Sequence, residues 1–124
     1  SDKMPFLLGF LKHMDQNGEA NIDKILDYYI DFYQDRIDKG LVVDRRTCPY
    51  NIETLKDRTF IKRNMLTNPF EKFERKRFMY YSKDLNMIAM NHALFRKLTD
   101  EDYKRIEKQM NDDLKDYYDK LEII

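Results

Sequence analysis

The segment from Asn21 to Gly40, "NIDKILDYYIDFYQDRIDKG", restricts the fold most, because its apolar residues recur at helical spacing. Asn21 can cap the first turn, Asp23 complements the positive end of the helix dipole, and Gly40 follows a basic last turn. The pattern predicts an amphipathic helix whose apolar face other elements must cover. That face consists of Ile22, Ile25, Leu26, Tyr29, Ile30, Tyr33 and Ile37.

Helical spacing also appears before and after this segment. Residues 5–14 predict a short amphipathic helix, with Pro5 at a tolerated first position. Between Leu55 and Ile61 the apolar phase slips, so we predict two short helices, 51–57 and 60–67, the second ended by "TNP". A turn of helix, "FEKFERK", follows Pro69.

A β-hairpin and a long helix are predicted for the remainder of the chain. The apolar runs "FMYY" and "MIAM" are joined by the polar "SKDLN", which favours a hairpin. Thr99 and Asp102 form a capping box for the last helix. Its apolar seam, which we expect to pack on the first two helices, is Tyr103, Ile106, Met110, Leu114, Tyr117 and Leu121. We therefore predict a mainly α (α+β) fold, a winged-helix-like helical domain with one small β-hairpin and a long C-terminal helix.

The length of 124 residues predicts a single domain, residues 1–124, that can fold without disulfides or metals. No apolar run approaches the roughly 20 residues of a membrane span, so no membrane partner is expected. The single Cys48 allows no internal disulfide, and a free thiol fits a reducing, cytoplasmic location. A chain that starts with Ser1 suggests a segment excised from a larger protein.

Residues able to support catalysis or hold a cofactor are few. His13, His92 and Cys48 are far apart in sequence and have no zinc-ligand spacing. No P-loop, G-x-G-x-x-G or G-x-S-x-G motif occurs. We expect no catalytic, cofactor-binding or metal site, and no enzymatic activity in this segment.

Charge is unevenly distributed along a chain whose formal net charge is zero. Residues 56–77 include eight basic and three acidic residues, whereas residues 15–38 include two and seven, and residues 100–122 five and nine. Concentrated basic side chains are typical of phosphate-backbone binding, although they can also form a solvated face or a protein-docking surface. The predicted nucleic-acid contacts are Lys56, Lys62, Arg63, Lys72, Arg75, Lys76, Arg77 and Lys83.

The nine tyrosines and eight phenylalanines could stack on unpaired bases, but most fall on predicted core stripes. Each of three adjacent tyrosine pairs should place one ring inward and one outward. The outward rings, free to meet a partner, are expected to be Tyr28, Tyr118 and one of Tyr80 and Tyr81.

The stretches "FYQDRIDKGL", "NPFEKFERKRFMYYSKDLNMIAMN" and "LFRKLTDED" together resemble an accessory C-terminal segment of large bacterial DEAD/DEAH-type helicases or restriction-associated ATPases. The resemblance implies that ATP-dependent motor or nuclease activity belongs to a preceding part of the parent protein. This segment would then be a non-catalytic accessory domain that holds duplex DNA or docks on other domains of the parent.

The alternative hypothesis is a protein-interaction module without nucleic-acid contact. Its surface would be the seam of the last helix or the apolar residues 87–90. For the isolated domain we expect a monomer, because the net negative charge of the last helix opposes a parallel copy of itself.

Overall fold

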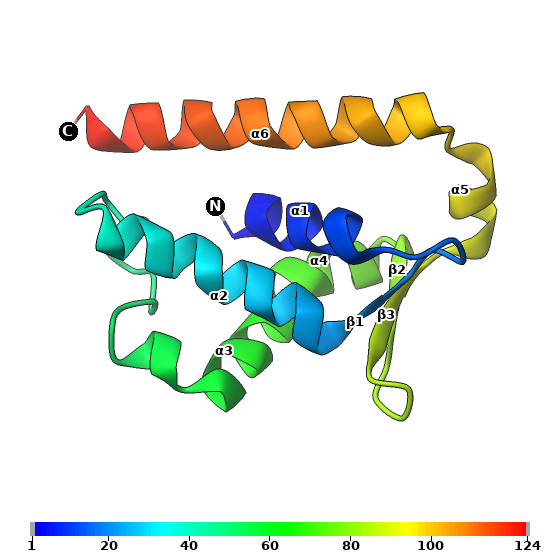
Figure 1. The fold of residues 1–124 in the computed structure, drawn as a ribbon, viewed down its shortest axis with the longest axis horizontal. Helices are drawn as coiled ribbons and strands as arrows, with labels where there is room; N and C mark the ends of the chain where they lie inside the picture. Colours follow the sequence, from blue (N-terminus) through cyan, green and yellow to red (C-terminus); the bar gives the residue numbers. More distant parts are fainter. Residues whose placement is uncertain (1, 124) are drawn as a thin grey trace.

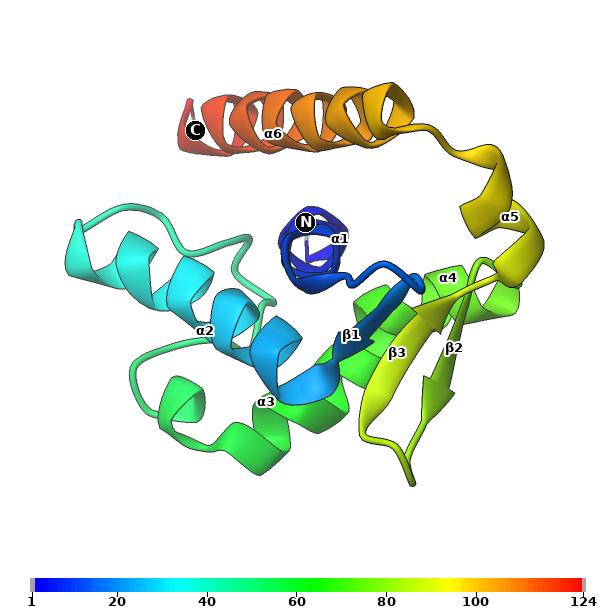
Figure 2. The ribbon, with the colours of Figure 1, turned by 45° about the vertical axis from the view of Figure 1, so that its right-hand side comes forward.

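Helix α1, Lys3–His13, lies between the long C-terminal helix α6, Asp100–Glu122, and the rest of the molecule. Figure 1 shows α6 running along one side of the computed structural model, with α2, Ile22–Asp38, on the other side of α1. Figure 2 shows α1 nearly end-on, with α6 above it and the small sheet to one side. The structure describes residues 2–123.

The remaining elements follow in the predicted order, with additions, but the helix predicted for residues 51–57 is wrong, because only a 3-10 turn forms there. Between α1 and α2 is the short strand β1, Glu19–Asn21, and after α2 a connector leads to the 3-10 turn η1, Thr54–Lys56. Then come α3, Arg58–Met65; the π-helical turn η2, Leu66–Phe70; α4, Glu71–Arg75; β2, Met79–Ser82; β3, Met87–Met90; and α5, His92–Lys97. The mainly α (α+β) class with a hairpin and a long last helix is confirmed.

The main core forms around the apolar side of α1. Phe6 and Phe10 are fully buried, and the Phe6 ring lies 6.1 Å from that of Phe70 and 5.8 Å from that of Phe73. From α2 the core receives Ile22, Ile25, Leu26, Tyr29 and Tyr33. The predicted stripe is thus mostly confirmed, while Ile30 and Ile37 at its margin are half-buried.

Local caps explain where α2 and α6 begin. The Asn21 side-chain oxygen accepts hydrogen bonds from the backbone N–H groups of Asp23 (2.9 Å) and Lys24 (3.2 Å). Thr99 and Asp102 form the predicted capping box, each side chain accepting from the backbone of the other. Both predicted helix starts are confirmed.

The hairpin is part of a three-stranded antiparallel sheet in the order β1-β3-β2. Strand β1 was not predicted, because a strand of three residues has no visible alternation. It pairs with β3 so that Ala20 faces Ile88, and the turn before it positions the Gly18 carbonyl to accept from Met90 N (2.8 Å). The element order up to the hairpin is α1-β1-α2-η1-α3-η2-α4-β2-β3.

The prediction that "TNP" ends a helix was wrong. Helix continues from α3 through η2 into α4, with Pro69 buried inside the wide π-helical turn. Pro69 cannot donate a backbone hydrogen bond. Nearby side chains compensate for the distorted turn, because Thr67 Oγ1 donates to the Arg63 carbonyl (2.9 Å) and Asn68 Nδ2 to the Asn64 carbonyl (3.0 Å).

Four of the six seam residues of α6, Met110, Leu114, Tyr117 and Leu121, pack on α1 and α2 as expected, in a second cluster with Met4 and Leu8. Tyr103 and Ile106 line an apolar pocket beside α5. Tyr118 was predicted to point outward, but it is buried. Its hydroxyl donates to the Val43 carbonyl (2.6 Å), and the Arg36 guanidinium lies 3.5 Å from its ring centroid. Tyr118 therefore ties α6 to α2 and to the connector after α2.

Tyr28 was also predicted to be free for a partner, and this prediction was wrong too. The ring is half-buried against the second cluster, and the Lys12 ammonium lies 5.5 Å from its centroid. In the third pair, Tyr80 is the exposed member, while Tyr81 turns inward toward Phe70.

Candidate nucleic-acid interface

The eight predicted cations lie along one bent helical stretch and the hairpin beside it. The stretch α3–η2–α4 covers residues 58–75 without a break, about 27 Å if it were straight. Its inward side carries Ile61, Met65 and Phe70, so Arg63, Lys72 and Arg75 are left on the exposed side. Of the eight cations, Lys62 is half-buried and the other seven are exposed.

The helical stretch and the hairpin meet where α4 leads into β2 and diverge from there (Figure 2). At one end, Asp23 at the start of α2 accepts from Arg58 through its carbonyl (3.0 Å) and from Asn86 in the hairpin turn through Oδ2 (2.8 Å). At the other end, the turn after α4 leads directly into β2, and Asn91 Nδ2 donates to the Arg77 carbonyl (3.2 Å). The start of α3 and the hairpin turn are therefore both tied to the start of α2, and the end of α4 lies near the hairpin base (Figure 2).

This arrangement separates the predicted residues into groups. Lys72, Arg75, Lys76 and Arg77 lie together on α4 and the turn after it. Lys83 is in the hairpin turn, about 20 Å away along an extended strand. Lys62 and Arg63 are on α3 and Lys56 is in η1. The cations thus form an extended band instead of a single cluster, which suits a linear polyanion better than a small anion.

Most of these cations have no acidic partner. Arg75 lies 3.8 Å from Glu71, and the other seven have no ion pair within residues 2–123. On α6, by contrast, Lys108 and Lys115 each reach a carboxylate one turn away at 2.8 Å. The charges of the band are therefore available to a ligand.

The structure shows two features of the charge distribution that the basic segment, residues 56–77, does not indicate by itself. Arg58 lies within it, yet its guanidinium is 2.7 Å from Asp27 and holds α3 to α2, so its charge is already matched. Arg96 and Lys97 of α5 were not predicted as contacts, but α5 begins at the hairpin base beside Asn91, and both are exposed. The basic last turn of α5 was the only sequence signal for them.

Arg77 has an unusual backbone conformation, with φ of 62°. It occupies the position after α4 at which glycine is usual, and Phe78 N donates to the Phe73 carbonyl while Arg77 N donates to the Glu74 carbonyl, both at 2.9 Å. An arginine in this left-handed region is strained. Backbone strain of this kind is often found at functional positions, which is consistent with a role for the Arg77 side chain.

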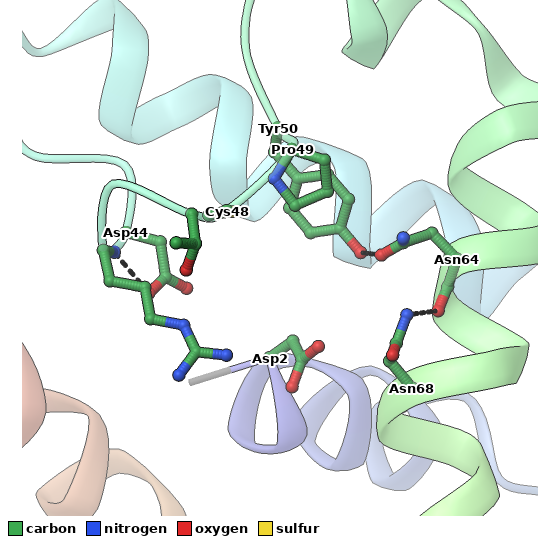
Figure 3. Close-up of a pocket in the computed structure, with 9 residues that line it drawn as sticks. Asp2, Asp44, Cys48, Pro49, Tyr50, Asn64 and Asn68 are labelled. Carbon is green, nitrogen blue, oxygen red and sulfur yellow. Dashed lines mark hydrogen bonds between the residues drawn. The ribbon is translucent and has the colours of Figure 1, made fainter.

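A polar pocket of about 330 Å³ lies away from this band, between the start of α1, the connector and the stretch α3–η2. Figure 3 shows Asp2 facing the connector residues across it, with Tyr50 donating to Asn64 Oδ1 (2.5 Å). The Tyr50 hydroxyl also shares a hydrogen bond with Tyr29 (2.6 Å). The polar groups of Tyr50 and Asn64 are thus already used to join the connector, α2 and α3.

Cys48 and His13 lie in pockets and have shifted pKa values. Burial raises the pKa of the Cys48 thiol at the polar pocket, which disfavours the reactive thiolate. Burial and the neighbouring Lys12 lower the pKa of His13, which lies in a separate pocket near α2. Within residues 2–123 no group of three or more His, Cys, Asp or Glu side chains is arranged to hold a metal ion.

Compared with protein-family models, curated proteins and solved structures, the chain gives no significant match. Among the described helices, none combines the length and apolar character needed to cross a membrane. The candidate interface therefore depends on the geometry and charge of this chain alone.

Proposed function

We propose that this chain is a non-catalytic accessory domain that contacts the phosphate backbone of duplex DNA without sequence preference. The contacts are made by the basic band, defined as Lys56, Lys62, Arg63, Lys72, Arg75, Lys76, Arg77 and Lys83. Phosphate contacts position a protein on DNA but carry no sequence information, and no base-reading residue is proposed.

The main support for the proposal is that most cations of the basic band form no ion pair with a carboxylate. Seven of its eight members have no carboxylate within ion-pair distance in the described residues, although acidic residues are equally numerous in the chain as a whole. Releasing counterions from DNA requires such unmatched cations. The helical stretch and the hairpin together spread them over a length comparable to several phosphates.

The alternative of a protein-docking module is less well supported by the surface. Its first candidate surface is the seam of α6, which packs on α1 and α2 from Met110 to Leu121, while Tyr103 and Ile106 line an apolar pocket. Its second, residues 87–90, consists of one buried and three half-buried side chains. All side chains of both surfaces are buried or half-buried, so the exposed apolar area that they offer a docking partner is small.

The proposed biological setting is a larger DNA-acting protein of the helicase or restriction type. It follows from the sequence resemblance, with ATP hydrolysis or nuclease chemistry assigned to other parts of that protein. Duplex DNA and the other domains of the parent are then the partners, and the cytoplasm is the proposed location. Alone, this domain is expected to be a monomer.

Reversing the charge of Arg75, Lys76 and Arg77 to glutamate is expected to weaken duplex binding for all sequences alike. The thermal midpoint should remain nearly unchanged, because exposed charges contribute little to stability. Fluorescence anisotropy with two unrelated duplexes, together with thermal unfolding, measures both effects.

The matched control reverses Lys104, Arg105 and Lys120 on α6, which changes the net charge equally but away from the band. Equal loss of binding in both variants would mean that net charge alone governs binding. Unfolding of the first variant would mean that its three cations are structural.

A further inference from the structure

Two aromatic rings in this chain are exposed, and they are two residues apart. The chain has eight phenylalanines and nine tyrosines, all within the described residues. Phe78 is 43% exposed and Tyr80 48% exposed, whereas every other phenylalanine and tyrosine is buried or half-buried. Single exposed apolar residues are common on surfaces, but here both rings directly follow the basic segment, residues 56–77, and precede Lys83.

The geometry of β2 leaves the Tyr80 ring accessible. Met79 and Tyr81 point toward the core, so Tyr80 between them stands on the outer face of the sheet. Its neighbour on β3 is Ala89, whose methyl group cannot cover a ring. Asn91 Nδ2 lies 3.2 Å from the Tyr80 hydroxyl and restrains the ring at its edge. One ring face is therefore presented without a partner side chain.

Cations lie at both ends of this aromatic surface. Lys76 and Arg77 directly precede Phe78, and Lys83 directly follows the last residue of β2. The opposing charges are Asp84 in the hairpin turn and Glu19, two strands away in the same cross-strand row as Tyr80. The positive charge is thus concentrated along the β2 side of the sheet, next to the rings.

Phe78 lines an apolar pocket together with Met79 and Met90, so Tyr80 is the ring on the outer face. We infer that the Tyr80 ring forms a stacking surface for an unpaired base of a nucleic-acid strand, whose phosphates are held by Lys76, Arg77 and Lys83. Exposed rings flanked by cations are the combination that binds single strands without sequence preference. The inference rests on the proposed function and extends it, because a duplex with an adjoining single-stranded tail can engage the basic band and the Tyr80 ring together.

The test compares a blunt duplex with the same duplex extended by single-stranded thymidine tails at either end, using the full chain at low salt. A tail of the correct polarity should tighten binding by at least about fivefold, the lower end of what stacking of one base contributes. Tyr80→Leu should abolish this gain and leave binding of the blunt duplex unchanged. Tyr80→Phe should retain the gain, and so should Leu85→Ala, which alters an exposed residue without a ring.

A 2-aminopurine base placed in the tail provides a second readout, since stacking on a ring changes its fluorescence. Loss of that change in Tyr80→Leu supports the inference. If the blunt duplex binds but neither tail adds affinity, or if Tyr80→Leu leaves the gain intact, the inference is wrong and the proposed function stands. If no duplex is bound, the proposed function itself is wrong.

Discussion

Phe6→Ala is expected to lower the free energy of unfolding by about 3 to 5 kcal/mol, because it removes a fully buried ring from the centre of the core. Phe6 on α1 contacts Phe70 and Phe73, so the cavity would open between α1 and the helical stretch that carries the basic band. A domain of this size is stabilised by only about 5 to 15 kcal/mol. Urea unfolding followed by circular dichroism measures the change.

The control is Leu85→Ala in the hairpin turn, where the side chain is 67% exposed. It should change stability by no more than about 0.5 kcal/mol. Similar losses in the two variants would contradict the central position of α1.

Gly18→Ala is expected to cost about 2 to 4 kcal/mol, the sum of backbone strain and overpacking. Gly18 has φ of 76°, and a Cβ at this position would lie 2.8 Å from Cδ1 of Phe95 on α5. The turn at Gly18 also aligns β1 with β3, so relaxation of the clash would disturb the sheet.

Gly40→Ala separates the two contributions to this cost. Gly40 has a similar φ of 68°, but nothing lies within 4 Å of a Cβ built there. It should therefore lose only the strain contribution, about 1 to 2 kcal/mol. The difference between the two variants in urea unfolding measures how tightly α5 is packed on Gly18, and equal losses would mean that α5 is loosely held.

The helices with a clear apolar stripe or a side-chain cap could be predicted from sequence. Asn21 and Thr99 act locally, within three residues of the groups they bind, so their role is visible without the fold. Strand β1 is defined by its pairing with β3, almost 70 residues later, and no local pattern indicates it. Helix α5 is only six residues long, too short for a periodic signal.

Tertiary contacts also decided the orientation of the tyrosines. Tyr117 and Tyr118 are adjacent on α6, and the seam alone favoured Tyr117 as the inward ring. Both reach the connector, because Tyr117 donates to Asp44 and Tyr118 to Val43, but Arg36 covers Tyr118 and leaves it the more buried. The course of the connector, which the sequence does not indicate, reversed the prediction.

The composition of the basic band was predictable, but its shape was not. Lys76 and Lys83 are seven residues apart in sequence, yet the hairpin carries them to its opposite ends. Only the structure distinguishes the matched charge of Arg58 from the unmatched charges of Lys62 and Arg63. Counting charges along the sequence shows neither where the hairpin places each cation nor which cations already form ion pairs.

The central claim, that the basic band contacts DNA phosphates, is tested most directly by the salt dependence of duplex binding. Affinity for a blunt duplex measured by anisotropy between 20 and 200 mM salt should fall with a logarithmic slope of about −3 to −4, corresponding to roughly four phosphate contacts. The slope should become shallower when Arg75, Lys76 and Arg77 are reversed. A flat response to salt, or no binding at the lowest salt, would contradict the account.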